Sequence, residues 1–158
     1  MNSINKVAVI GAGLMGGGIA SHIANSQTEV ILLDMVSYEG KNRNKISETA
    51  LKNLYKSEPA SFMHKSFGKY ITPGNLEDDL GLLYECDWIC EAVIENLEIK
   101  KSLYKKIDVN RSDRSIVTSN TSTIPLQNLV EGLSEKFQSN FAITHFFNPP
   151  RYMRLLEI

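Results

Sequence analysis

The sequence has few cysteines, no long apolar run and no excess of charge of either sign, and each shortage excludes a class of protein. Its 158 residues contain 17 Lys and Arg against 18 Asp and Glu, a net charge of −1. Without a basic excess the chain lacks the field that attracts nucleic acid or an acidic membrane, so neither is expected as a partner. Apolar runs such as 7–10 and 30–33 are far shorter than the roughly 20 residues of a membrane-spanning helix.

The two cysteines, Cys86 and Cys90, have neither the spacing nor the flanking residues of a CxxC redox pair. Their strand-like surroundings are typical of buried, free thiols in a reducing compartment, which excludes a disulfide-stapled secreted domain. No His and Cys spacing resembles a zinc site, so no metal is predicted. The few residues that precede the first strand-like run leave no room for a signal peptide, and we expect a cytoplasmic protein.

The sequence does contain an alternation of short β-branched runs and amphipathic segments. Because strands that alternate with helices form βαβ units, we predict one α/β domain, doubly wound around a mostly parallel sheet of the Rossmann type. Residues 57–80 are interpreted as a loop with short structure. Strands are predicted at 6–10, 29–34, 87–93, 115–119, 141–147 and 153–158, and helices at 14–25, 43–56, 97–109 and 125–133, the last opened by Pro125 after a cap at Thr123.

The segment Gly11–Gly16 matches G-x-G-x-x-G between a predicted strand and a predicted helix. The first glycine permits a tight turn, the second lets a pyrophosphate approach the backbone, and the third lets the helix pack on the strand. The helix start adds free N–H groups and the positive end of its dipole. The alternative is a generic glycine turn. We predict that a dinucleotide is held by Gly11, Gly13, Leu14, Met15 and Gly16.

An acidic residue stands where a ribose-binding carboxylate belongs, about 20 residues further on and at the end of the second predicted strand. This residue is Asp34, which follows the run 30–33. A carboxylate accepts hydrogen bonds from both ribose hydroxyls and repels a 2′-phosphate. Because no Arg follows immediately, the sequence favours NAD over NADP.

Two polar segments follow later strands. Glu91–Asn96 lies where the nicotinamide half of a dinucleotide would run, and Ser119–Ser122 follows the next strand. Taken singly, each is equally well explained as capping and turn chemistry.

His145 lies near the end of an apolar strand, where a histidine is more often a satisfied core residue. The last predicted strand would place Glu157 on an apolar face with Met153 and Leu155. Because an unpaired carboxylate there is destabilising by several kcal/mol, we expect Glu157 to pair with His145. One imidazole nitrogen would then be held, and the other would be free to take a proton.

Taken together, the motifs resemble the NAD-binding domain of the L-3-hydroxyacyl-CoA dehydrogenase family, and most closely its long bacterial members that carry a hydratase-like region. The resemblance rests on the segments 9–20, 91–96, 119–122 and 145–149. It implies oxidation of the 3-hydroxyl of an acyl-CoA to a ketone in fatty-acid β-oxidation, with hydride passing to NAD. In that reaction His145 would be the general base, Glu157 would orient it, and Ser122 would bind the C3 oxygen of the substrate.

The resemblance also implies roles outside the reacting centre. Asn148 would help to hold the cofactor, and Glu95 and Lys100 match family positions near it. Lys52 and Lys56 are candidates for contacts with coenzyme A in a segment that has diverged from the family pattern.

The family continues into an α-helical domain that completes the acyl pocket and forms the dimer, and this sequence does not contain it. We therefore expect 1–158 to be an NAD-binding domain truncated at its C-terminal end, which self-associates or binds the missing helical region. One alternative is a non-catalytic NAD-binding module or relic. Another is a different hydroxyacid or polyol-phosphate dehydrogenase. Such enzymes usually rely on a catalytic lysine, and the His145–Glu157 pair argues against this alternative.

Overall fold

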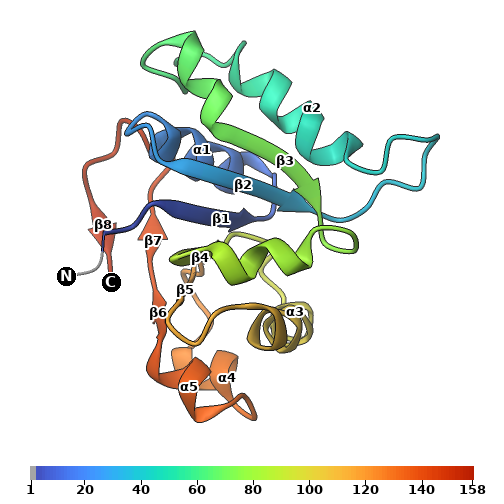
Figure 1. Ribbon diagram of the computed structural model, residues 1–158. Coiled ribbons are helices and arrows are strands. Elements are labelled where there is room, and N and C mark those ends of the chain that lie inside the picture. Colours follow the sequence, from blue (N-terminus) through green and yellow to red (C-terminus); the bar gives the residue numbers. More distant parts are fainter. Residues whose placement is uncertain (1–2) are drawn as a thin grey trace.

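The computed structural model describes residues 3–158 and has a parallel β-sheet at its centre (Figure 1). The six strands are hydrogen-bonded in the order β3-β2-β1-β4-β5-β6, and every pair of neighbours is parallel. This order reverses between β1 and β4, so the predicted doubly wound α/β fold is confirmed. The strands are β1 (Lys6–Ile10), β2 (Glu29–Asp34), β3 (Ile71–Asn75), β4 (Trp88–Glu91), β5 (Ile116–Ser119) and β6 (Phe141–Ile143).

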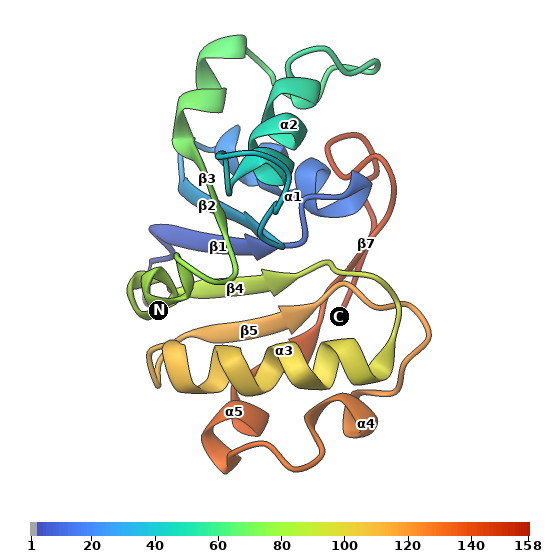
Figure 2. The same cartoon turned by 90° about the vertical axis from the view of Figure 1, so that its right-hand side faces the viewer.

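Helices cover both faces of the sheet, which explains why the strands are apolar at successive positions rather than at alternate ones. In β1, Val7 and Val9 belong to a core with α1, whereas Ala8 and Ile10 belong to a second core with α3. Figure 2 shows α3 running alongside β5. The helices are α1 (Leu14–Ala24), α2 (Lys45–Leu54), α3 (Leu97–Asn110), α4 (Leu126–Val130) and α5 (Glu135–Ser139), with 3₁₀ turns at Lys65–Tyr70 and Leu80–Glu85.

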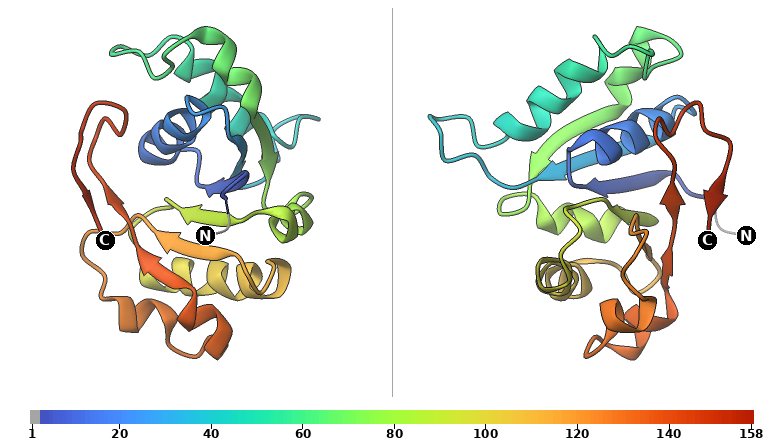
Figure 3. Two further views of the ribbon diagram at one scale, coloured as in Figure 1. Left: turned by 60° about the vertical axis from the view of Figure 1, so that its left-hand side comes forward. Right: turned by 180° about the vertical axis from the view of Figure 1, so that it is seen from behind.

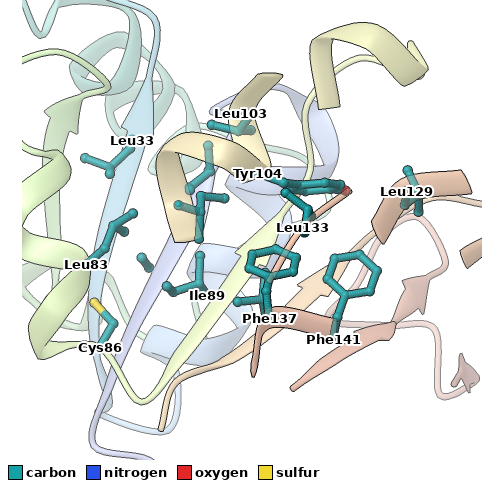
Figure 4. Close-up of a cluster of buried hydrophobic side chains, with 14 of the residues drawn as sticks. Leu33, Leu83, Cys86, Ile89, Leu103, Tyr104, Leu129, Leu133, Phe137 and Phe141 are labelled. Carbon is teal, nitrogen blue, oxygen red and sulfur yellow. The ribbon is translucent and has the colours of Figure 1, made fainter. Parts of the chain in front are cut away.

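An aromatic cluster closes the second core beneath α3 (Figure 4). The ring centroids of Tyr104 and Phe137 lie 5.8 Å apart, and Phe141 lies 5.5 Å from Phe137 and 5.3 Å from Tyr104. Arg111 lies over the Phe137 ring at 5.3 Å. Because aromatic rings bury large areas, this cluster fixes α3 and α5 against the sheet.

Residues 57–80, interpreted as a loop with short structure, contain a 3₁₀ turn and the edge strand β3, which was not predicted. Its middle, with Pro73 and Gly74, has poor strand propensity. The strand forms because it pairs in register with β2, with Pro73 opposite Leu32. A proline is tolerated there because β3 lies at the edge of the sheet, where one side of the backbone has no partner.

The predicted strand 141–147 is in fact two strands that belong to different sheets. β6 ends at Ile143, and β7 (His145–Phe146) pairs antiparallel with β8 (Leu156–Glu157). Figure 3 shows this pair beside the main sheet. The expected final strand 153–158 is therefore only two residues long, and the arm 147–155 connects β7 to β8.

The region after β5 also differs from the prediction. Pro125 precedes α4 as its cap residue, and Thr123 does not cap this helix but donates its hydroxyl to Glu95. The short helix α5 was missed, although Ser134 caps it by accepting a hydrogen bond from the backbone N–H of Phe137.

No helix within residues 3–158 is long and apolar enough to cross a membrane. Met1 and Asn2, at the start of the segment judged too short for a signal peptide, lie outside the described residues.

Replacing Phe137 with Ala is expected to lower the free energy of unfolding by about 3–5 kcal/mol, because it leaves a cavity in a fully buried aromatic cluster. Urea denaturation measures this loss. Tyr84→Ala is the matched control, since Tyr84 is 71% exposed and its loss should change stability by at most about 0.5 kcal/mol. Equal effects of the two substitutions would contradict this account of the core.

Candidate functional site

The glycine turn between β1 and α1 is dictated by close backbone contacts at two of its three glycines. Gly11 has φ +101°, and a Cβ there would lie 2.6 Å from the carbonyl oxygen of Ala92. A Cβ at Gly16 would lie 1.7 Å from the carbonyl oxygen of Gly11. A Cβ at Gly13, by contrast, would meet no protein atom within 4 Å. Packing therefore requires the first and third glycines, and the second leaves open space in front of the turn.

Helix α1 begins at this open space. Its cap residue is Gly13, no side chain caps it, and its first turn contains no acidic residue. The first N–H groups and the positive end of the helix dipole are thus not neutralised by a carboxylate of the first turn. Together with the space at Gly13, this arrangement fits a phosphate group. Leu14, which opens the helix, is exposed.

Asp34 joins the end of β2 to the glycine turn. Its Oδ2 accepts a hydrogen bond from the backbone N–H of Ala12 at 2.5 Å, and its Oδ1 accepts one from Met35 at 2.6 Å. Each carboxylate oxygen can accept a further hydrogen bond. The side chain therefore both anchors the turn and retains acceptor capacity for ribose hydroxyls.

A cavity of about 480 Å³ lies between α1, α2 and the arm 147–155. Gly13, Asn53, Leu54 and Asn148 are among its lining residues. The arm closes over α1 so tightly that a Cβ at Gly18 would lie 2.9 Å from a ring carbon of Pro150.

The two candidate lysines near α2 lie outside this cavity. Lys52 is exposed and lies 3.9 Å from Glu48, and Lys56 is also exposed, just beyond the C-terminal end of α2. Both side chains are therefore exposed to solvent, and neither residue lines the cavity.

The structure brings His145 and Glu157 together. They are register partners in the β7–β8 pair, and the imidazole Nδ1 lies 2.8 Å from Oε2 of Glu157. The burial argument for the pair was wrong, because the Glu157 side chain is 59% exposed and Met153 and Leu155 are exposed as well. Cross-strand register, rather than relief of a buried charge, brings the two side chains together.

Ser122 faces the same pair. It lines a cavity of about 250 Å³ with His145 and Glu157, and Ile143 and Pro125 contribute apolar walls. A hydroxyl, an imidazole and a carboxylate from three separate segments thus surround one small space.

The loop that carries Ser122 is held by Glu95. Its Oε1 accepts hydrogen bonds from the hydroxyls of Thr121 and Thr123, and its Oε2 lies 3.4 Å from Nζ of Lys100. Burial tends to raise the pKa of Glu95, but the hydrogen bonds from the two threonines and the charge of Lys100 outweigh it. The pKa of Glu95 therefore lies below its ordinary value.

Lys100 and Glu91 are fully buried and form an ion pair at 2.7 Å. The structure therefore turns the Lys100 ammonium toward Glu91 and Glu95. The expectation that the Glu91 carboxylate would lie along a cofactor was wrong, since its side chain lies inside the fold, where Tyr104 also donates a hydrogen bond to it at 2.5 Å. Burial, reinforced by the neighbouring Glu91 charge, raises the pKa of the Tyr104 hydroxyl, which thus remains a donor.

Two contacts near the pair were not anticipated. Asn120 accepts a hydrogen bond from the backbone N–H of Phe146 at 2.8 Å, which ties β7 to the loop after β5. Arg151 donates to the carbonyl oxygens of Ala60 and Phe62 at 2.5 and 2.9 Å, which fixes the arm. Asn120 lies in a motif that the sequence singled out, but only the pairing of β7 reveals its partner.

No group of three or more His, Cys, Asp and Glu side chains within residues 3–158 is arranged to hold a metal ion.

Known proteins match this chain over almost its whole length. Residues 6–158 match the model of the family described as 3-hydroxyacyl-CoA dehydrogenase, NAD binding domain. The chain is 50% identical over 157 residues to a Rickettsia felis protein provisionally named a fatty acid oxidation complex trifunctional enzyme. The aligned region covers 99% of this chain and 22% of that protein. It is 44% identical to a Deinococcus radiodurans protein provisionally named 3-hydroxyacyl-CoA dehydrogenase, with 98% of this chain and 45% of that protein covered.

A solved structure shares the fold as well. The crystal structure of 3-hydroxybutyryl-CoA dehydrogenase from Escherichia coli K12 superposes with a TM-score of 0.80 at 26% identity, covering 98% of this chain and 32% of that one. The chain thus spans between about a fifth and a half of the length of these relatives. The family match identifies NAD as the cofactor of the domain. The chain belongs to the 3-hydroxyacyl-CoA dehydrogenase family, and its residues 6–158 match the NAD-binding domain of that family.

Proposed function

We propose that this domain binds NAD and serves the oxidation of an L-3-hydroxyacyl-CoA to a 3-oxoacyl-CoA in fatty-acid β-oxidation. The observation that carries the proposal is the joint placement of His145, Glu157 and Ser122 around one cavity. The pair lies on the segment that follows the parallel sheet, on the side of the carboxyl ends of its strands. Dinucleotides bind at that edge, next to the reversal of strand order.

His145 and Glu157 have the geometry of a general base and the group that orients it. The Glu157 carboxylate holds Nδ1, so Nε2 is the nitrogen available to take the proton of the substrate hydroxyl. The negative charge of Glu157 stabilises the imidazolium that results. NAD, held at the glycine turn and Asp34, would supply the hydride acceptor for the oxidation of the C3 hydroxyl to a carbonyl.

Ser122 has a different task in this proposal. Its hydroxyl can donate a hydrogen bond to the C3 oxygen and so keep that oxygen directed at His145. Glu95 lies beneath the same loop with 39% of its side chain exposed, which leaves part of its carboxylate accessible beside the bound cofactor.

The larger cavity is lined by Gly13, where the diphosphate of NAD would lie, and coenzyme A, the rest of the substrate, would lie on its α2 side near Asn53 and Ser57. Asn148, on the arm, also lines this cavity. Asn148 would hold the cofactor and the arm together. Lys52, in α2, and Lys56, just beyond it, are exposed and would supply ammonium groups for the phosphates of coenzyme A outside the cavity.

Partners and location follow from the surface. Because the arm and β8 expose several large apolar side chains, we infer that a helical region or a second copy of the chain covers them. The exposed apolar side chains of the arm, of β8 and of the residue after it are Tyr152, Met153, Leu155, Leu156 and Ile158.

The two free, buried cysteines favour the cytoplasm, and burial raises the pKa of Cys90 to about 12. The identity to bacterial relatives favours a bacterial source.

Replacing Gly13 with Ala should preserve the fold and weaken NAD binding at least about tenfold, because the added methyl group meets no protein atom but fills the space for the diphosphate. Thermal unfolding and calorimetric titration with NAD measure the two effects. Gly81→Ala is the matched control, since a Cβ at Gly81 also meets no protein atom within 4 Å. Unchanged affinity in the Gly13 variant would place NAD elsewhere.

Replacing His145 with Gln should lower kcat by about 100- to 10,000-fold, the usual contribution of a positioned acid–base group, while leaving the Kd for NAD unchanged. The assay follows oxidation of NADH by acetoacetyl-CoA in the complete protein. Turnover that survives the substitution undiminished would remove His145 as the base. NAD binding without any turnover by the unsubstituted protein would instead favour the non-catalytic module.

A further inference from the structure

Glu91 is a fully buried carboxylate whose acceptor sites are all used. Oε1 accepts from Nζ of Lys100 and from the backbone N–H of Val93, both at 2.7 Å. Oε2 accepts from the hydroxyls of Tyr104 at 2.5 Å and Ser119 at 2.6 Å. Burying a charge is unfavourable unless it is paired and fully hydrogen-bonded, and here four donors satisfy that condition. The carboxylate joins β4, β5 and α3 at a single point.

One chain of contacts runs from this point to Ser122. Lys100 lies between two carboxylates, with its Nζ 2.7 Å from Glu91 and 3.4 Å from Glu95. Glu95 in turn accepts the hydroxyls of Thr121 and Thr123, the residues on either side of Ser122. Residues 121–124, which carry Ser122, are called the serine loop. Its position is thus set by the alternating charges of Glu91, Lys100 and Glu95.

A second chain of contacts runs from Glu91 to His145. The backbone N–H of Asn120 donates to the carbonyl oxygen of Glu91 at 2.7 Å. The side chain of Asn120 then accepts the N–H of Phe146 at 2.8 Å, one residue from the imidazole. The His145 side of the small cavity is therefore held through the main chain of residue 91, and only the Ser122 side depends on its carboxylate.

We propose that Glu91 is a positioning residue that sets the distance between the Ser122 hydroxyl and the His145 imidazole without touching either side chain. The inference rests on the proposed function and deepens it. Stability alone does not call for a charge here, because a buried ion pair is often no more stable than apolar residues of the same volume. The charge of Glu91 has a specific task. It holds the Lys100 ammonium between the two carboxylates, so that Lys100 in turn keeps Glu95 directed at the serine loop.

Replacing Glu91 with Gln tests the placement of the loop directly. The amide keeps the shape but removes the charge that holds Lys100, so Lys100 is no longer fixed between the two carboxylates and Glu95 loses its support. We expect amide hydrogen exchange in residues 121–124 to accelerate at least about tenfold. Ser115→Ala is the matched control, because it removes a buried hydrogen bond to the carbonyl oxygen of Cys86 at the opposite end of β5. That control should lower Tm without loosening the serine loop. Unchanged exchange in the Glu91 variant would overturn the proposal.

The double variant Glu91→Gln with Lys100→Met separates positioning from folding. With both charges gone, the buried site is neutral and Tm should recover toward that of the unsubstituted chain. The serine loop should still exchange rapidly, because a methionine cannot hold Glu95. Recovery of loop protection together with Tm would mean that Glu91 only supports the fold. Because the double variant leaves no unpaired buried charge, it provides the test even if the single variant does not fold.

A double-mutant cycle in the complete protein links the loop to the reaction. Glu91→Gln should lower kcat about 10- to 100-fold, the effect of misplacing a catalytic group by about 1 Å, with the Kd for NAD changed less than about threefold. In a Ser122→Ala background the same substitution should lower kcat by less than about threefold, because the hydroxyl that it misplaces is already absent. Fully additive losses would overturn the proposal. A chain whose loop loosens as expected but that never turns over would refute the proposed function and leave the positioning intact.

Discussion

Parallel strand pairing is the constraint on which the rest of the structure depends. Because neighbouring strands run in one direction, β1, β2, β4 and β5 all end at one edge of the sheet. The glycine turn, Asp34, the Glu95 loop and the Ser122 loop are therefore neighbours in space although they are far apart in the sequence. β7 and β8 then bring the His145–Glu157 pair to the same region.

The polar network under that edge converts proximity into fixed geometry. A loop at the end of a strand is otherwise the most mobile part of such a fold. Here Glu91 ties β4 to β5 and α3, and Glu95 ties α3's first turn to the threonines around Ser122. The loop that carries Ser122 is thus supported by a buried carboxylate beneath it, an arrangement that preorganised catalysis requires.

The features that the sequence predicted correctly are those carried by local residue order. The G-x-G-x-x-G turn lay between a strand and a helix, and Asp34 closed the second strand, so their places in the fold followed from general rules. Strand β3 did not follow, because Thr72, Pro73 and Gly74 form a strand only when β2 is alongside. Glu91 was predicted to lie where the nicotinamide half of a dinucleotide would run. Its burial depends on hydrogen-bond donors from α3 and β5, and no local sequence pattern shows that these donors surround it. Glu157 was correctly paired with His145 for an incorrect reason, since register rather than burial joins them.

The central claim is that this edge of the sheet brings NAD, a base and a hydroxyl to one carbon atom of the substrate. The most direct measurement follows deuterium from C3 of labelled 3-hydroxybutyryl-CoA in the complete protein, with NAD in excess. Transfer of the label to the nicotinamide ring, slowed in parallel by loss of the His145 imidazole, is the result that the account predicts. Binding of both ligands with no label on the nicotinamide would contradict it.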